Sequence, residues 1–513
     1  MFAKISSIGL FGLNAFPVTA EISASQGVSS VDIVGLADQS VQESRMRIKS
    51  AVENSGMKCG AVKCVINLSP AGVKKTGSGY DLAILTALLA AYGYVPSELD
   101  GKAFIGEVSL GGDICPVNGA LAMAVEAAEN GITELYVPHA NAAEAALVKG
   151  LRVFGVKTVR ELADHLMGRG MIKPAAPPEL TEESYKSVPD FADVKGQESV
   201  KSAIEVAAAG FHNMLMIGPP GTGKSMIAKR IPSVLPKMSF EESIETTKIH
   251  SVAGVLPPES PLVTLRPFRD VSHTASAVGL IGGGSIPKPG EISLAHNGVL
   301  FLDEFPEFDR RVLETLRQPL ENGGITISRA AGSVTYPCSI MLVAAMNPCP
   351  CGNYGSPLKK CFCTRQQVAK YLGKISQPIL DRIDIQTEVS PVKYEELAGN
   401  TKSECSAAMA ERIAAARERQ AKRFSGSAIK WNSQITPDIL HEVCALGDEA
   451  NAYMKLAFER TGLSARAYDR VLKVARTCAD LEGSETIEKR HLARAISYRS
   501  LDRKYWGGAL SLS

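Results

Sequence analysis

The residues best suited to chemistry form a glycine-rich segment, GPPGTGKS at 218–225, between the apolar run LMI and the helix-like MIAKRI. Glycines let successive backbone N–H groups turn inward around phosphate oxygens, and a helix N-terminus attracts the same negative charge. Lys224 is expected to reach the β- and γ-phosphates of ATP, and Ser225 to bind Mg²⁺. We therefore predict a phosphate-binding loop made of Gly218, Pro219, Pro220, Gly221, Thr222, Gly223, Lys224 and Ser225.

Two later apolar runs end in polar residues that could complete this site. GVLFLDE ends in Asp303 and Glu304, and SIMLVAAMN ends in Asn347. In open α/β sheets, ligands bind at the carboxyl ends of the strands. We expect Asp303 to hold Mg²⁺ through water, Glu304 to polarise the attacking water, and Asn347 to orient that water or contact the γ-phosphate. A solvated turn is the alternative for the two acids.

Two C-x-C pairs follow Asn347, formed by Cys349, Cys351, Cys361 and Cys363. Four thiolates on a short loop match the ligand count of a structural Zn²⁺ site, which is our prediction. Most such sites use C-x2-C spacing, so two disulfides or four unbound thiols remain alternatives. The same loop carries Lys359 and Lys360, which could contact nucleic acid or only water.

These motifs lie within three blocks of different composition. Residues 1–168 mix strand-like runs with Ala-rich helical stretches and predict an α+β or α/β domain. Residues 169–190 are rich in Pro, Glu and Ser without periodicity and predict a linker. Residues 191–395 alternate strands and helices, which predicts an α/β core. Residues 396–513 show apolar residues at three-to-four spacing, which predicts a helical domain.

The overall composition limits what the chain can bind. Its 513 residues include 56 Lys plus Arg and 54 Asp plus Glu, so the net charge is only +2. No global field attracts DNA or an anionic membrane, and DNA binding would need local cationic patches. No apolar run reaches the roughly 18 residues of a membrane span. ISSIGLFGLNAF is interrupted by polar residues and favours a first strand over a signal peptide. Eleven cysteines then favour a cytoplasmic location.

Four stretches together, GPPGTGKS, GEISLAHNGVLFLDE, LRQPLENGGITISRA and AAMNPCPCG, resemble the magnesium-chelatase-like AAA+ ATPases, specifically their YifB/ComM branch. The resemblance covers nearly the whole chain. It implies a P-loop AAA+ core with a helical lid, in a ring-shaped, hexameric ATPase whose sites lie between subunits. It assigns an arginine finger to Arg382, which would reach the γ-phosphate of a neighbouring subunit. It assigns the second sensor to Arg466, in contact with phosphate of its own chain, with Arg470 as the competing choice. A surface salt bridge is the alternative for either arginine.

The N-terminal block resembles the Lon-like domain of the ribosomal S5 domain-2 superfamily, on KKTGSGYDLAI and GEVSLGGDICPVNGALAMAVEAA. A Lon-type peptidase needs a Ser nucleophile and a Lys that activates it. The match places Gly79 at the Ser position and Leu121 at the Lys position, with Ser78 one residue away. We therefore expect no peptidase activity, and a substrate-facing or assembly role for this block.

The resemblance also implies an insert in the second core helix, within residues 248–290, that projects toward the ring pore. Residues 323–337 alternate apolar and polar side chains around AAG, which predicts a β-hairpin. The DNA-contact candidates are Lys288, Arg329, Lys359 and Lys360, because no base-reading motif is present and binding should be backbone-led.

Two other cationic features have simpler interpretations. The basic run ERIAAARERQAKRF is more typical of a solvated helix face with internal ion pairs than of a DNA surface. His273 is more typical of a structural or coupling residue than of a metal ligand.

Three functions remain compatible with this sequence. The first is an ATP-driven ring motor on DNA, which the ComM resemblance implies to promote branch migration in recombination or natural transformation. The second is a magnesium-chelatase motor subunit; the D-x-S-x-S signature of the integrin-like domain that such a system needs is absent from this sequence and could be on another chain. The third is an unfoldase or assembly ATPase built around an inactive Lon-like domain. We favour the first, because the whole arrangement with its cysteine loop resembles that branch.

Overall fold

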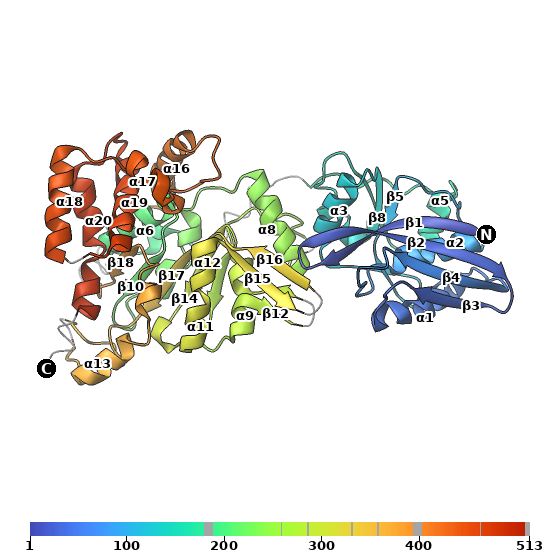
Figure 1. Cartoon of the computed structure of the whole chain (residues 1–513), viewed down its shortest axis with the longest axis horizontal. Coiled ribbons are helices and arrows are strands. Elements are labelled where there is room, and N and C mark those ends of the chain that lie inside the picture. Colours follow the sequence, from blue (N-terminus) through green and yellow to red (C-terminus); the bar gives the residue numbers. More distant parts are fainter. Residues whose placement is uncertain are drawn as a thin grey trace.

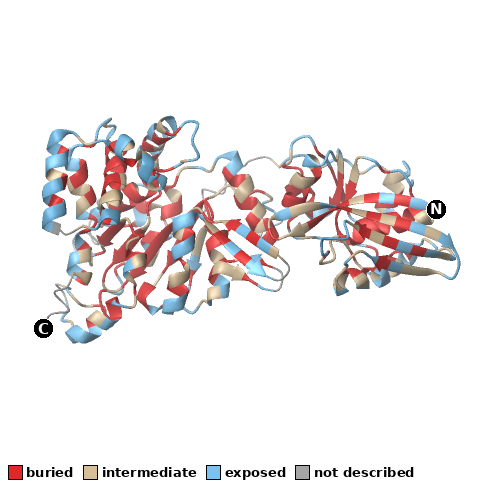
Figure 2. Ribbon diagram, viewed as in Figure 1, coloured by how far each residue is buried: buried red, intermediate tan, exposed pale blue. Residues whose placement is uncertain are grey.

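The computed structural model describes residues 1–178, 188–257, 259–284, 287–329, 332–356, 359–392, 403–461 and 463–507. The molecule is elongated (Figure 1). The N-terminal unit forms one end, the sheet that carries the phosphate loop lies in the middle, and the C-terminal helices form the other end. Buried residues fill both sheets and the inward faces of the helices (Figure 2). Within the described residues, no helix has the length and apolar character needed to cross a membrane.

The N-terminal unit is a seven-stranded mixed sheet in the order β3-β4-β2-β1-β5-β8-β9. Helix α2 (Asp81–Ala91) is rich in apolar residues, and its residues 81–90 are all buried. The remaining strands and helices are β1 (Phe2–Phe11), β2 (Asn14–Gln26), β3 (Ser30–Val34), α1 (Gln39–Asn54), β4 (Val62–Ser69), β5 (Lys102–Phe104), β6 (Glu107–Val108), β7 (Ile114–Cys115), α3 (Ala120–Glu129), β8 (Glu134–Pro138), α4 (Ala142–Ala145), β9 (Arg152–Val156) and α5 (Val159–Leu166).

The N-terminal unit extends beyond its predicted end at residue 168. Pro174 forms a bridge with Phe154, and the N–H of Ala175 donates to the carbonyl of Val153 at 2.8 Å. The first part of the predicted linker is therefore attached to the sheet. Residues 179–187 lie outside the described residues.

The middle unit contains a five-stranded parallel sheet in the order β11-β14-β17-β10-β18. Its strands are β10 (Met214–Ile217), β11 (Phe268–Val271), β14 (Gly298–Leu302), β17 (Ile340–Met346) and β18 (Ile385–Glu388). Strand β10 lies between β17 and β18, whereas the next strand in the chain, β11, lies at the far edge. The chain direction across the sheet reverses beside β10, and such reversal points form ligand-binding crevices.

Helices cover this sheet and connect its strands. They are α6 (Glu198–Gly210), α7 (Lys224–Ala228), α8 (Phe240–Ala253), α9 (Ala277–Ile281), α10 (Glu291–Leu294), α11 (Arg310–Thr315), α12 (Arg317–Asn322), α13 (Arg365–Leu372) and α14 (Gln377–Leu380). The insert expected within residues 248–290 is smaller than that range. The range begins inside α8 and includes β11, and only a short hairpin, β12 (Gly282–Gly283) with β13 (Lys288–Pro289), separates α9 from α10.

The β-hairpin predicted for residues 323–337 is confirmed as β15 (Gly324–Arg329) paired with β16 (Gly332–Pro337). The two hairpins lie side by side. The hydroxyl of Tyr336 donates to the carbonyl of Pro287 at 2.7 Å, and Nε of Arg329 donates to the carbonyl of Gly284 at 3.2 Å.

The C-terminal unit is helical, as predicted, although its expected start at residue 396 lies outside the described residues. It contains α16 (Ser406–Arg423), α17 (Pro437–Val443), α18 (Asp448–Thr461), α19 (Ala465–Glu482) and α20 (Lys489–Ser497). Buried Trp431 stacks on Phe211 of the middle unit, and the Arg417 guanidinium lies 3.4 Å from its ring centroid. The C-terminal helices are therefore packed firmly onto the core that they cover.

Two of the contacts between the N-terminal unit and the middle unit involve α8 and the β15–β16 hairpin. Glu144 accepts hydrogen bonds from the Leu121 N–H at 2.8 Å and from the hydroxyl of Ser251 on α8. The β1–β2 turn contacts the β15–β16 hairpin, because Cβ atoms built at Gly12 and Gly332 would meet Val334 and Phe11 respectively. The N-terminal unit therefore touches the hairpin that carries Arg329.

Candidate nucleotide-binding site

The predicted phosphate loop connects β10 to α7, as the spacing required. Gly218 lies so close to β18 that a Cβ there would overlap the carbonyl of Val389. Gly221 and Gly223 have φ of +78° and +86°, a region that favours glycine. The Lys224 ammonium donates to the carbonyls of Gly218 at 2.7 Å and Pro219 at 2.9 Å. These contacts hold the Lys224 side chain inside the loop with which it is expected to bind phosphate.

The three strand-end residues meet the phosphate loop. Lys224 Nζ donates to Oδ1 of Asn347 at 3.2 Å, and the hydroxyl of Ser225 donates to the Asp303 carboxylate. A hydroxyl and a carboxylate in contact are ligands that suit Mg²⁺. Glu304 has φ of +51°, and its N–H donates to Oδ1 of Asp303 at 2.8 Å. Because of this left-handed backbone conformation at Glu304, the side chains of Asp303 and Glu304 point in different directions.

His273 was not assigned to this site from the sequence, but its Nδ1 lies 3.0 Å from Oε2 of Glu304. The side chains are 41% and 54% exposed, respectively, so their pairing is solvent-screened and weak. No linear motif joins them, because His273 follows β11 and Glu304 follows β14. The contact gives His273 the coupling position considered above, one hydrogen bond away from the expected catalytic acid.

Burial lowers the pKa of Lys224 from 10.5 to about 8, although the negative charges of Asp303 and Glu304 act in the opposite direction. The lysine is buried in a cavity of about 390 Å³ that is lined by Pro220–Met226, Asp303, Glu304, Met346 and Asn347. We call this the phosphate-loop cavity. One cation, two acids, a hydroxyl and an amide can bind phosphate and Mg²⁺ and position a water molecule.

A second polar cavity, of about 560 Å³, contains the predicted arginines. We call it the arginine cavity; its charged lining residues are Glu321, Arg382, Asp384, Arg466, Asp469, Arg470 and Lys473. Arg382 is 8% exposed and pairs with Glu321, while its Nε has no hydrogen-bond partner among the described residues. Arg470 lies 3.6 Å from Asp384, whereas Arg466 is exposed. The structure thus brings Arg466 together with Arg382 and does not place it in the lining of its own phosphate-loop cavity.

Sequence reasoning missed Lys473 in this cavity. Burial lowers the pKa of Lys473, with Asp384 opposing that effect and Arg470 adding to it. Lys473 lies at helical spacing from Arg466 and Arg470 on α19, and this spacing is the sequence feature that could have identified it.

The four predicted cysteine ligands converge. The Sγ–Sγ distances are 3.4 Å for Cys349–Cys351, 3.7 Å for Cys349–Cys361 and 3.6 Å for Cys351–Cys361. The four sulfur atoms, including that of Cys363, lie within 4.8 Å of one another, and all four cysteines are free thiols. Ligands of a tetrahedral site with Zn–S bonds of about 2.3 Å lie about 3.8 Å apart. The donor set and spacing fit zinc.

The DNA-contact candidates separate into two groups. Lys288 and Arg329 are exposed on the two neighbouring hairpins. Lys359 and Lys360 are exposed on the cysteine loop, and α13, which follows that loop, lies across the core from the hairpins (Figure 1). The structure does not bring the two groups together.

Three other cationic residues of the 248–290 region have intrachain partners. Arg266 pairs with Glu242 at 2.9 Å, Arg269 pairs with Glu291 at 2.6 Å, and His250 contacts the carbonyl of Leu294 at 2.9 Å.

The basic run on α16 mainly attaches that helix to its neighbours. Arg412 pairs with Glu205 and Glu404, and Arg423 pairs with buried Asp480. This agrees with the interpretation of internal ion pairs.

The residues at and near the positions of a Lon-type Ser–Lys pair make contacts other than those of a catalytic pair. The Ser78 hydroxyl donates to Glu107, the Lys75 ammonium donates to the carbonyl of Pro70, and Leu121 is fully buried. Nearby Asp81 is buried and accepts hydrogen bonds from Arg47 on α1, at 2.9 Å and 3.1 Å. These contacts connect α1 and α2.

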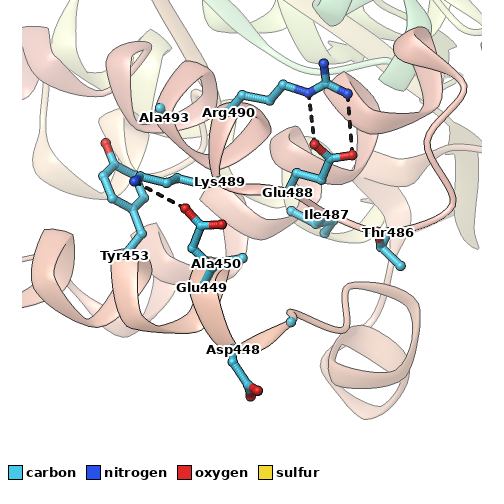
Figure 3. A pocket seen from close by; sticks show the side chains of 11 residues that line it. Asp448, Glu449, Ala450, Tyr453, Thr486, Ile487, Glu488, Lys489, Arg490 and Ala493 are labelled. Atoms are coloured by element: carbon cyan, nitrogen blue, oxygen red, sulfur yellow. Dashed lines mark hydrogen bonds and ion pairs between the residues drawn. The ribbon is translucent and has the colours of Figure 1, made fainter.

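A larger hollow of about 800 Å³ lies on the C-terminal helices, lined by Gly447–Ala450, Tyr453, Thr486–Arg490 and Ala493 (Figure 3). Its charges face one another: Lys489 lies 3.3 Å from Glu449, and Arg490 lies 3.2 Å from Glu488. Such paired, exposed charges offer little to a phosphate. This hollow is therefore less suited to a nucleotide than the smaller phosphate-loop cavity.

The parallel sheet, the phosphate loop after its switch-point strand, the acids after β14 and the helical C-terminal unit define a P-loop ATPase core of the AAA+ class. Three family models match the chain. "Magnesium chelatase, subunit ChlI" matches residues 190–397, "Subunit ChlI of Mg-chelatase" matches 20–141, and "Magnesium chelatase, subunit ChlI C-terminal" matches 403–499. The chain belongs to the YifB/ComM family of magnesium-chelatase-like AAA+ proteins, and this membership implies ATPase activity.

Relatives match along almost the full length. Protein YifB of Escherichia coli is 41% identical over 495 residues, covering 96% of each chain. Competence protein ComM of Haemophilus influenzae is 40% identical over 511 residues, covering 98% of each chain. The 38 kDa subunit of magnesium chelatase of Cereibacter sphaeroides is 23% identical over 338 residues, covering 61% of this chain and 91% of that subunit. Lon protease 2 of Bacillus subtilis is 24% identical over 183 residues, 32% of each chain.

Proposed function

We propose that this protein is an ATP-hydrolysing ring motor, a hexamer, that acts on DNA. The observation that carries the proposal is the separation of two complementary cavities in one chain. The phosphate-loop cavity contains Lys224, Asp303 and Glu304 and, among the described residues, no arginine, whereas Arg382 and Arg466 both line the arginine cavity. A head-to-tail ring would place the arginine cavity of one subunit against the phosphate-loop cavity of the next.

Five side chains of the phosphate-loop cavity then have a defined task. The backbone N–H groups of the loop and Lys224 bind the β- and γ-phosphates. Ser225 and Asp303 would hold Mg²⁺, which neutralises phosphate charge, with Asp303 acting through water. Glu304 accepts a proton from the attacking water, and Asn347 orients that water beside the γ-phosphate.

The arginines are proposed to act on the neighbouring subunit's nucleotide. Arg382 would leave Glu321 and stabilise the charge that develops on the transferred phosphoryl group. Because Arg466 lines the same cavity, its phosphate contact is proposed to be in trans as well, whereas the family resemblance implies a contact in cis. Arg470 is less suited to this role, because it already pairs with Asp384.

DNA is proposed as the substrate of the motor, with branch migration in recombination or natural transformation as its use. Two findings support this: the cationic residues on the adjacent hairpins, and the full-length similarity to a competence protein. Hairpin contacts would be repeated around the ring axis, so a few cations per subunit suffice despite the small net charge. A magnesium-chelatase-type role is the second candidate, supported by the three family models and the 38 kDa subunit.

Two further assignments complete the proposal. The four clustered cysteines bind one structural Zn²⁺. Eleven cysteines, all free thiols, support a reducing compartment, which we take to be the cytoplasm.

ATP turnover with and without single-stranded and branched DNA, at two salt concentrations, tests the substrate. We expect DNA stimulation that weakens with salt. The Lys288→Ala/Arg329→Ala variant should lose DNA retention, while Lys359→Ala/Lys360→Ala is the matched control of equal charge change. Glu304→Gln supplies the turnover-deficient reference. Failure of the wild-type chain to be retained on DNA at low salt would contradict the DNA proposal and leave the ATPase proposal standing.

A further inference from the structure

The cysteine loop, whose described residues are 348–356 and 359–364, lies directly against the phosphate loop. Gly352 is in van der Waals contact with Pro220, and any Cβ at Gly352 would overlap the Pro220 ring. The loop begins one residue after Asn347, which itself accepts a hydrogen bond from Lys224. A change in the path of this loop would therefore reach the nucleotide site through both Pro220 and Asn347.

The other side of the loop contacts the C-terminal end of the described chain. The rings of Tyr354 and Tyr505 have centroids 6.4 Å apart, and the Tyr505 hydroxyl donates to Glu388 at 2.7 Å. Glu388 pairs in register with Ile217, the residue immediately before the phosphate loop. The cysteine loop thus lies between the phosphate loop and a C-terminal segment that is itself connected to the strand beside β10.

Little regular structure holds this loop in place. Its described residues form no helix or strand. Its internal hydrogen bonds are local: the Gly352 N–H donates to the carbonyl of Cys349 at 2.9 Å, and the Asn353 amide donates to the carbonyl of Cys351 at 3.2 Å. Ordering such a segment costs backbone conformational entropy at each residue. Among the described residues, contacts between the thiols join the beginning of the loop to its end, and the Tyr354 N–H points at Cys349 Sγ, at 3.3 Å.

We infer that the four thiols bind one zinc ion whose task is to hold residues 348–364 against Pro220, so that metal occupancy controls nucleotide binding and turnover. This inference rests on the proposed ATPase function. Metal binding supplies free energy that offsets the cost of ordering the loop, because the metal–thiolate bonds form together only when the loop brings its four sulfur atoms to one point. The metal site is then a support of the phosphate loop and not an independent surface module.

Two variants of the full-length chain separate metal loss from loop displacement. Cys361→Ser/Cys363→Ser removes two ligands, and Cys405→Ser is the matched control, because Cys405 is an exposed thiol outside the cluster. Gly352→Ala keeps all four ligands but pushes the loop away from Pro220. For each variant we measure the zinc content per chain, the number of free thiols, the affinity for a fluorescent ATP analogue, ATP turnover and thermal unfolding.

We expect one zinc per wild-type and Cys405→Ser chain, and none in the double variant. Nucleotide affinity should fall in the double variant, and turnover should fall about 10²-fold, as for a misplaced catalytic group. Gly352→Ala should retain zinc but lose turnover. If the double variant unfolds, removal of zinc from the wild-type chain by a chelator and its restoration give the same comparison reversibly.

The outcomes distinguish this inference from the function on which it rests. Wild-type chains that hydrolyse ATP with no bound zinc and four titrating thiols would overturn the inference alone. So would zinc loss that leaves nucleotide affinity and turnover unchanged. Wild-type chains that contain zinc but neither bind nor hydrolyse ATP would overturn the proposed ATPase and, with it, the control by metal.

Discussion

The phosphate-loop cavity and the arginine cavity differ in how the chain builds them. The first is lined mainly by one continuous stretch, Pro220–Met226, and by the ends of two adjacent strands. The second draws on separate segments around Phe211, Leu320, Arg382, Ile435 and Arg470. The first contains both acids expected to act on metal and water, while the second contains four cationic side chains against three acidic ones.

This difference shows how the charges of one ATPase site are divided. Holding unpaired arginines beside an empty phosphate site would be costly, because buried like charges repel and lose hydration. In the single chain, Arg382 instead pairs with Glu321 and Arg470 with Asp384. A neighbouring nucleotide would offer Arg382 a stronger, doubly charged partner. The comparison predicts that a ring in which either cavity is disrupted is inactive. Mixing subunits that each keep a different cavity intact should restore function.

Loss of the arginine finger should have the largest effect. Arg382→Ala is expected to lower kcat by about 10³-fold or more, with nucleotide binding retained, because the guanidinium acts on transition-state charge. Arg382→Lys keeps the charge without the planar fork and should recover little. Single-turnover and binding measurements check this, and an equal loss of binding and kcat would place Arg382 in ground-state recognition instead.

Loss of the catalytic acid should rank second. Glu304→Gln is expected to lower kcat by about 10²- to 10⁴-fold, because the amide cannot accept the proton of the attacking water. ATP affinity should be preserved, so the variant should trap ATP-bound rings. Glu307→Gln, a nearby exposed acid that pairs with Lys374, is the matched control. Retention of normal turnover by Glu304→Gln would exclude this residue as the base.

Mixed rings decide on which subunit Arg466 acts. Lys224→Ala and Arg466→Ala should each reduce turnover severely when pure. Mixed in equal amounts, about one quarter of interfaces combine an intact phosphate loop with an intact arginine from the next subunit, if assembly is random and head-to-tail. Turnover near that fraction supports action in trans. A mixture as inactive as its components would return Arg466 to its own chain's nucleotide.

The smallest expected effect is on pH dependence. Lys224 has a pKa near 8, so its positive charge is present below pH 8 and is lost as the pH rises through that value. Phosphate favours the protonated form, so ATP binding should take up close to one proton per site at pH 9 and almost none at pH 7. Calorimetry of MgATP binding in buffers of different ionisation enthalpy measures this uptake. Equal uptake at the two pH values would contradict the assignment.

The sequence predictions were correct where the cooperating residues are close together along the chain or joined by a general rule of sheet geometry. Gly218–Ser225 is a local pattern, and its meeting with Asp303 and Asn347 follows from the rule that parallel strand ends share one edge of a sheet. The β15–β16 hairpin was also predicted correctly, because its alternation is local. The His273–Glu304 contact was not predictable, because the order of strands β11 and β14 is set by tertiary packing. The same holds for the contact of Gly352 with Pro220.

The sequence by itself determined the class of chemistry: a phosphate loop, two acids, a polar strand end and four thiols close enough along the chain to share an ion. Only the tertiary structure decided which partners each group meets. It placed Arg466 beside Arg382, separated Lys359 and Lys360 from the hairpin cations, and set the cysteine loop against the phosphate loop. The physical reason is that glycine, lysine and cysteine patterns specify local backbone and ligand chemistry. Long-range pairings, in contrast, depend on how the sheet order and helix packing bring distant segments together.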